Sequence, residues 1–224
     1  MSIRDINVRE DLWEYLSHTE KPILLYGMGN GADKILQVCE ERGISVADTF
    51  ASDGFVRGHS FHGKTVLSYS SAKEKYGQFI VLLSFASSLP DVLDLIHRVA
   101  AEQELYAPDV PVFGNTLFDR PFFEAHRSEL EEVEDMLADK RSVDTFKNVI
   151  LYKLTGKIEY LDASESDEQE SFSELLPIAT MSHYTDLGAY NGDTVRKLLP
   201  CSPTLMHVTA FEPDRRKQMT SWEG

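Results

Sequence analysis

The sequence predicts an α/β protein that begins with a doubly wound, Rossmann-like parallel sheet and continues through a helical connector into a second strand–helix–strand unit. Three observations predict this class. Short apolar runs alternate with amphipathic segments between about residues 20 and 115, which is typical of parallel strands joined by crossover helices. Apolar residues at helical spacing follow, and a second glycine-rich turn lies around Gly188. We expect domains at 1–117, 118–162 and 163–224, with an acidic linker at 162–174.

The first strand and its helix show the clearest pattern. A short amphipathic helix at 8–17 leads to the apolar run 23–26, which suits a strand buried on both faces of a parallel sheet. The glycine-rich turn 27–32 follows at once, and residues 33–42 are apolar at helical spacing. Gly43 then stands where a helix typically ends.

The rest of the first half continues this alternation. We expect strands at 44–52, 65–67 and 79–84, and helices at 71–76 and 91–104. The run 110–113 is interpreted as the last strand, at the edge of the sheet. It contains Pro111, and proline cannot donate to a ladder in the sheet interior.

The middle of the chain predicts two helices, at 121–139 and 143–154. Their apolar residues recur at helical spacing among many acids, so we expect them to pack through one face and leave the other in water. The stretch 162–174 is the richest in acids and serines, which favours a linker between domains.

The first glycine-rich turn supports two interpretations. Gly27, Gly29 and Ala32 fit a relaxed dinucleotide fingerprint, and Asp53 stands at the end of the next strand, where an acid would bind a ribose. A nucleotide or a nucleotide-sugar is therefore a candidate ligand. A tight turn also selects glycine for its backbone geometry alone, so a purely structural turn is the other interpretation.

The second turn carries a stronger signal. The run TDLGAYNGDT at 185–194 has the pattern of a strand end, a glycine-rich turn and a helix start, and FEPD at 211–214 ends a second strand. Glycines let a ligand approach the backbone, helix N-terminal amides face it, and a carboxylate can accept from both ribose hydroxyls. This arrangement is the one needed to hold an adenosine.

These motifs resemble the first two motifs of the FkbM-type S-adenosylmethionine-dependent methyltransferases. MLADKRS at 136–142, with Phe146 and YKLTG at 152–156, is similar to the helical region before those motifs in bacterial members. The resemblance implies that 163–224 begins a class I methyltransferase domain with S-adenosyl-L-methionine as cofactor. It implies that the turn faces the methionine part and that Glu212 binds the ribose. The matching cofactor-binding positions are Asp186, Gly188, Ala189, Gly192, Asp193, Thr194 and Glu212.

The resemblance implies O-methylation of a saccharide or of a small-molecule hydroxyl. Only two strands of the methyltransferase sheet can be read in this sequence, so we expect the chain to be truncated after the second motif and inactive as it stands. The catalytic base cannot be assigned to a residue. The alternative function is a nucleotide- or nucleotide-sugar-binding scaffold that uses the first turn. A homo-oligomer, with a second copy covering the open edge, is a further expectation.

Composition narrows the classes of partner. The formal net charge of −15, from 22 basic and 37 acidic residues, repels phosphates, so we expect neither nucleic acid nor a membrane as partner. Cys39 and Cys201 form no disulfide framework, which indicates a cytoplasmic protein. We expect no metal site, because the histidines lack a third ligand nearby.

Overall fold

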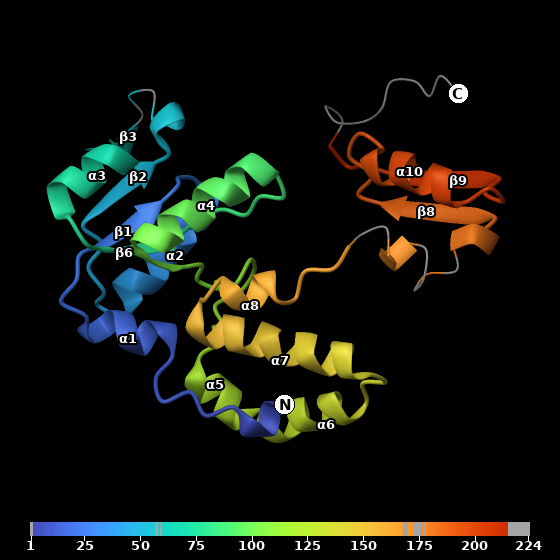
Figure 1. Cartoon of the computed structure of the whole chain (residues 1–224), viewed down its shortest axis with the longest axis horizontal. Helices are drawn as coiled ribbons and strands as arrows, with labels where there is room; N and C mark the ends of the chain where they lie inside the picture. Colours follow the sequence, from blue (N-terminus) through green and yellow to red (C-terminus); the bar gives the residue numbers. More distant parts are fainter. Residues whose placement is uncertain are drawn as a thin grey trace. The chain divides into compact units, whose positions relative to one another are not determined.

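The chain folds into two compact units, Met1–Ser164 and Glu165–Gly224. The computed structural model in Figure 1 describes residues 2–56, 58, 60–167, 170–172, 176 and 178–214. The helices expected as a connector at 118–162 belong to the first unit. Part of the acidic stretch 162–174, namely 168–169 and 173–174, lies outside the described residues.

A five-stranded parallel sheet forms the centre of the first unit, which confirms the α/β class. Its strands are β1 (Ile23–Tyr26), β2 (Asp48–Ala51), β5 (Leu67–Ser68), β6 (Ile80–Leu83) and β7 (Glu104–Tyr106). They lie in the order β5-β2-β1-β6-β7, and every neighbouring pair is parallel. The direction of winding reverses between β1 and β6, as it does in doubly wound sheets.

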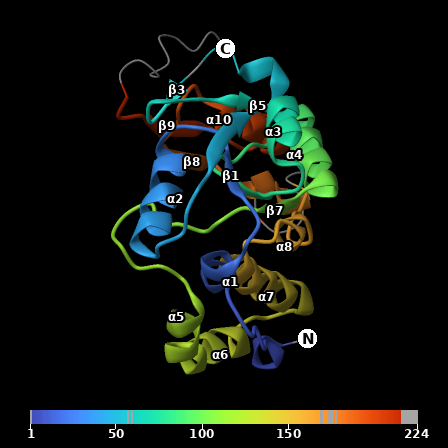
Figure 2. The same ribbon diagram turned by 90° about the vertical axis from the view of Figure 1, so that its left-hand side faces the viewer.

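Helices cover both faces of this sheet. Figure 2 shows α2 (Asn30–Glu41) on one side and α3 (Tyr69–Tyr76) and α4 (Pro90–Glu102) on the other. Because side chains alternate along a strand, Leu25 packs with α2 and α1 (Leu12–His18), whereas Leu24 packs with α3 and α4. β1 and β6 are therefore buried on both faces, which explains why their sequences are continuous apolar runs.

The start of α2 approaches the end of β6 closely because two glycines lack a Cβ. A Cβ on Gly31 would overlap the carbonyl oxygen of Ser84, and one on Gly27 would lie 2.6 Å from the Phe85 ring. Gly27 also has φ +106°, a backbone conformation that L side chains rarely adopt. Packing therefore requires glycine at both positions, where the winding of the sheet reverses between β1 and β6.

β5 and β7 form the edges of the sheet, and the prediction of an edge strand at 110–113 is wrong. The chain leaves the sheet at Ala107, whose N–H donates to the carbonyl of Gly156 at the end of a later helix. The carbonyls of Pro111 and Val112 accept from Lys34 Nζ of α2, at 2.8 and 2.6 Å, which replaces ladder pairing. Val112 and Phe113 are 88% and 97% exposed, whereas Val110 packs against the core on the α2 face.

A helical layer completes the first unit. It comprises α5 (Arg120–Ala125), α6 (Arg127–Asp135), α7 (Lys140–Thr155) and α8 (Glu159–Asp162). The helix expected at 121–139 is broken at His126, which leaves helical geometry with φ −109° and ψ 12°. Ile3, beside the N-terminus, packs with Phe123 and Ile150, and its N–H donates to the buried Glu134 carboxylate at 2.8 Å. Figure 1 shows the N-terminus beside α6.

Asp11 joins the helical layer to α1. One of its carboxylate oxygens caps α1 by accepting from Glu14 N–H at 2.8 Å, and the other accepts from Arg120 N–H at 2.8 Å. The Glu14 carboxylate pairs with the Arg120 guanidinium. Asp11 is 1% exposed, and the hydrogen bonds to both of its oxygens offset the desolvation cost of its burial.

The second unit contains a two-stranded parallel sheet of β8 (His183–Leu187) and β9 (His207–Phe211), joined through α10 (Asp193–Leu198). Short elements complete the described chain: the hairpin β3 (Ser60–Phe61) and β4 (Lys64–Thr65), and 3-10 turns at Ile3–Asp5, Asp53–Phe55, Ile178–Thr180 and Leu199–Cys201. None of the helices within the described ranges has the length and hydropathy that crossing a bilayer requires.

We predict that Gly31→Ala destabilises the first unit. Alanine gains about 1 kcal/mol of helix propensity over glycine, but its Cβ meets a backbone oxygen that cannot rotate away, and overpacking costs about 1–3 kcal/mol. The urea midpoint, followed by Trp13 fluorescence in a Trp222→Phe background, should fall. Gly54→Ala is the control, because no described atom crowds that position. A midpoint unchanged by Gly31→Ala contradicts the packing role.

We predict an acid-dependent loss of stability at the α1–α5 junction. The hydrogen bond from Arg120 lowers the pKa of Glu14 from 4.5 to about 2. A carboxylate whose pKa is lower in the folded state than in the unfolded state stabilises the fold above the unfolded pKa. This stabilisation is lost as the pH falls, here between about pH 4.5 and 2. Both side chains are about a third exposed, so the contribution is about 1 kcal/mol or less. The free energy of unfolding, measured with urea, should change less between pH 7 and pH 3 in Glu14→Gln than in the wild type. An equal difference in both proteins contradicts the assignment.

Candidate functional site

The second glycine-rich turn connects β8 to α10 through three residues with positive φ. Gly188 has φ +101°, Gly192 φ +76° and Tyr190 φ +45°. Glycine adopts these values without strain, whereas Tyr190 is held there by its surroundings. No described atom lies within 4 Å of the place where a Cβ on Gly188 would stand. The backbone at Gly188 is therefore open to a ligand.

Glu212 lies against this turn, as the adenosine interpretation requires. Its Oε2 accepts from the Tyr190 N–H at 2.8 Å, and its Oε1 accepts from the Asp214 N–H at 2.7 Å. The carboxylate is half-buried at the carboxyl end of β9. The structure thus brings together the turn and the acid that follows the second strand, across 22 residues of sequence.

The amides at the start of the turn hold it to β9. Gly188 and Ala189 both donate to the carbonyl of Phe211, at 2.8 and 2.9 Å. Gly192 donates to the carbonyl of Ala189 at 2.6 Å. These N–H groups position the turn and Glu212 relative to each other, so a ligand would meet the carboxylate and the open face of Gly188.

Asp186 is the unusual residue of this unit. It is 8% exposed, and its buried Oδ2 has no hydrogen-bond partner among the residues that the structure describes. Burial, together with the charge of Asp186, raises the pKa of Tyr184, two residues earlier on the same strand face. An unsatisfied buried acceptor costs about 1–3 kcal/mol, and such groups often mark functional sites.

The other predicted residues of this site divide by exposure. Ala189 is 5% exposed and belongs to the packed interior of the unit, and Gly192 is also buried. Asp193 and Thr194, in the first turn of α10, are exposed. Their roles in binding stay predictions.

The first glycine-rich turn differs in how it uses its residues. Packed side chains occupy the space beside Gly27, and Ala32 is fully buried in the core on the α2 face of the sheet. Gly29, with φ +93°, has no described atom within 4 Å of its Cβ position. Of the three predicted turn positions, Gly29 is the one open to a ligand.

Asp53 is engaged by the start of α3. Its Oδ1 accepts from the Ser70 N–H at 3.1 Å and its Oδ2 from the Ser70 hydroxyl at 2.6 Å. The hydrogen bonds from Ser70 lower the pKa of Asp53. This carboxylate therefore stabilises a helix start, and its role in binding a ribose stays a prediction.

An apolar cavity of about 280 Å³ lies at the carboxyl ends of β1, β2 and β6. Its walls come mainly from Tyr26, Met28, Phe85, Val92 and Leu95. The Phe85 ring stands edge-on to the Tyr26 ring, with centroids 5.1 Å apart and planes at 86°. The carboxyl ends of strands beside the crossover point are where open α/β sheets bind ligands.

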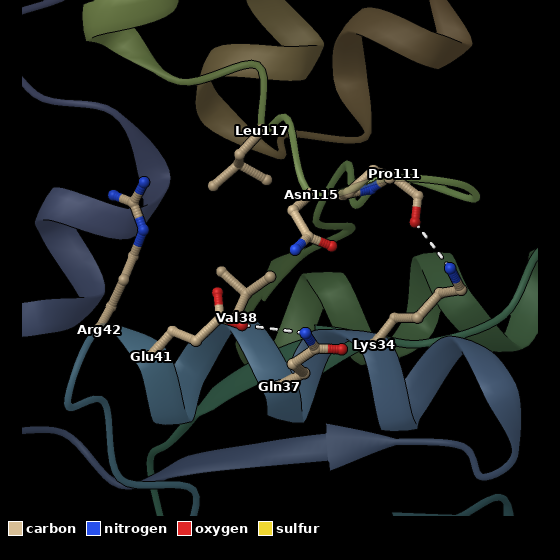
Figure 3. A pocket seen from close by; sticks show the side chains of 9 residues that line it. Lys34, Gln37, Val38, Glu41, Arg42, Pro111, Asn115 and Leu117 are labelled. Carbon is tan, nitrogen blue, oxygen red and sulfur yellow. Dashed lines mark hydrogen bonds between the residues drawn. The ribbon is translucent and has the colours of Figure 1, made fainter.

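A smaller pocket of about 110 Å³ lies between α2 and the segment 110–117 (Figure 3). Lys34 extends from α2 to the Pro111 carbonyl, and Gln37 is hydrogen-bonded to Glu41. None of the predicted site residues lines this pocket. Lys34 holds the segment against the helix.

Sequence reasoning missed three residues that shape these sites. Tyr190 binds Glu212 through its backbone, which no sequence pattern reports. Gly31, rather than Ala32, makes the close approach of α2 to β6. Phe85 follows the strand expected at 79–84, and the doubly wound strand order could have placed it beside Gly27, because these two strands are neighbours at the crossover.

Comparison with known proteins shows the fold. A scan of protein-family models matched no family, and no curated protein matched the sequence. The structure is similar to the crystal structure of the methyltransferase FkbM from Methylobacillus flagellatus KT, with a TM-score of 0.57 and 18% sequence identity. The match covers 88% of this chain and 56% of that one, so the chain spans about half the length of that protein. The likeness establishes that the two proteins share a fold over the matched region.

We predict that Glu212→Ala exposes the Tyr190 amide. Hydrogen bonds to charged acceptors contribute about 1.5–3 kcal/mol, so amide exchange at Tyr190 should accelerate by about ten- to a hundredfold. Hydrogen–deuterium exchange resolved by NMR measures this directly. Glu165→Ala, at an exposed site in the same unit, should leave the rate unchanged. Unchanged protection in Glu212→Ala contradicts the contact.

Proposed function

We propose that this chain carries the cofactor-binding part of an FkbM-like methyltransferase that uses S-adenosyl-L-methionine. The observation that carries the proposal is the contact between the Glu212 carboxylate and the Tyr190 amide, which places an acid at the glycine-rich turn. An acid at the end of the second strand is suited to accept from both hydroxyls of a ribose. The methyltransferase-like fold supports the same assignment.

The residues present fit the cofactor in two respects. The open space at Gly188 lets the backbone approach a ligand, which a side chain at that position would prevent. The unpartnered Oδ2 of Asp186 is an acceptor suited to a cationic ammonium group, provided that a small rearrangement exposes it. Glu212 would hold the ribose, and Gly188 and Asp186 would face the methionine part.

When bound, S-adenosyl-L-methionine supplies an activated methyl group on a sulfonium. The contribution of this chain is to fix the position of that group, since proximity and orientation account for much of the rate of such displacements. Glu212 and the turn at Gly188 perform this positioning. We propose a saccharide or a small-molecule hydroxyl as the acceptor, so that the reaction is an O-methylation.

Turnover is proposed for a longer polypeptide than the chain described. The match covers 56% of the FkbM structure, and the second unit supplies one strand–helix–strand unit of a methyltransferase sheet. We therefore expect cofactor binding without methyl transfer from this chain alone. We also propose a cytoplasmic location, because Cys39 and Cys201 are free thiols.

Isothermal titration with S-adenosyl-L-methionine tests the proposal. Saturable binding is expected, and Glu212→Ala should weaken it by about ten- to a hundredfold, because a charged acceptor is lost from the ribose position. Glu165→Ala serves as the matched control. Absence of heat for a well-folded protein, including a version extended to the length of the FkbM structure, would falsify the assignment.

A further inference from the structure

We propose that the apolar cavity of the first unit binds a nucleoside through its base. The cavity lies where the ends of β1, β2 and β6 meet, at the point where the winding of the sheet reverses. This site is separate from the cofactor position at Glu212, which belongs to the second compact unit.

The size of the cavity favours one ring system with a sugar. Pockets for drug-sized ligands have volumes of about 300–1,000 Å³, and this cavity, at about 280 Å³, lies at the lower limit of that range. A dinucleotide is too large to be enclosed. A purine or pyrimidine can enter with its ribose left outside, near the turn that contributes Gly27 and Met28 to the wall.

The walls favour a flat, uncharged ring. Phe85 and Tyr26 form an aromatic corner, and Met28 and the aliphatic Val92 and Leu95 line the cavity with them. None of the described residues that line the cavity carries a formal charge. Such walls bind the faces of an aromatic ring and offer nothing to neutralise a phosphate.

Hydroxyls of two residues in the wall can donate to a ring with acceptor atoms on its edge. The hydroxyls of Tyr26 and Ser52 are hydrogen-bonded to each other, and either one can be the donor. Two hydroxyls carry two protons, and the bond between them uses one, so the second can be donated to a ligand. Ring nitrogens and carbonyl oxygens of nucleobases are acceptors of this kind.

The position of Asp53 bears on which part of the ligand is recognised. Asp53 is hydrogen-bonded to Ser70 and is not among the residues that line the cavity. The cavity walls therefore recognise the base rather than the sugar. A nucleoside should bind as well as its phosphorylated form, and a sugar phosphate without a base should not bind.

Titration of the full chain with adenosine, uridine, ADP and ribose 5-phosphate, by calorimetry and saturation-transfer NMR, tests this inference. We expect saturable binding of adenosine or uridine and none of ribose 5-phosphate. ADP should bind within about threefold of adenosine. Absence of nucleoside binding, or ribose 5-phosphate binding as tightly as a nucleoside, overturns the proposal, as does ADP binding more than about tenfold tighter than adenosine.

Cavity-filling variants locate the site. Ala86 is exposed at the rim, so Ala86→Trp should fill the cavity and weaken nucleoside binding at least about tenfold. Ala101→Trp, the same change at an exposed position near the end of α4, should leave affinity unchanged. Glu212→Ala should also leave it unchanged, which separates this site from the proposed cofactor site. If Ala86→Trp does not fold, Val92→Phe provides the same test. Unchanged affinity in the folded cavity variant contradicts the assignment.

Discussion

The first unit depends on a close approach between two backbones, where α2 begins and β6 ends. Gly31 and Gly27 have no Cβ, and the space that a Cβ would occupy is taken by Ser84 and Phe85. This contact sets how near α2 can lie to the sheet, and therefore how Leu25 and Leu82 are covered on that face. It also brings Phe85 against Gly27, which forms one wall of the apolar cavity. The same contact thus determines both the packing of the crossover and the shape of the opening beside it.

The sequence predicted the elements whose patterns are local. The run 23–26 became β1 unchanged, because a four-residue apolar run between a proline and a glycine turn has few other stable states. The run 110–113 has the same apolar character, yet it lies outside the sheet. Its carbonyls bind Lys34, which is distant in sequence, and β7 takes the edge position instead. Strand pairing and side-chain-to-backbone bonds compete for the same groups, and apolar content alone does not decide between them.

The two glycine-rich turns show why a motif only partly defines a site. Around Gly188 the pattern and the following acid converge, because Glu212 binds the backbone of the turn that the motif describes. Around Gly27 the pattern is a weaker, relaxed form of such a motif, and its acid, Asp53, supports the start of α3. The spacing of glycines and acids reports strand, turn and strand correctly in both places. Whether the acid faces the turn depends on which helix start lies nearer, and that information resides in tertiary structure.

The parallel pair β8 and β9 ends in an exposed pair of apolar side chains. Leu187 and Phe211 are opposite each other in the register and are 79% and 55% exposed. Parallel strands are usually buried on both faces. The pair therefore exposes apolar side chains, and its outer edges carry backbone N–H and C=O groups that can pair with another strand. This combination promotes self-association when a protein is concentrated or warmed. The end of this strand pair is therefore one place where a second copy of the chain can associate.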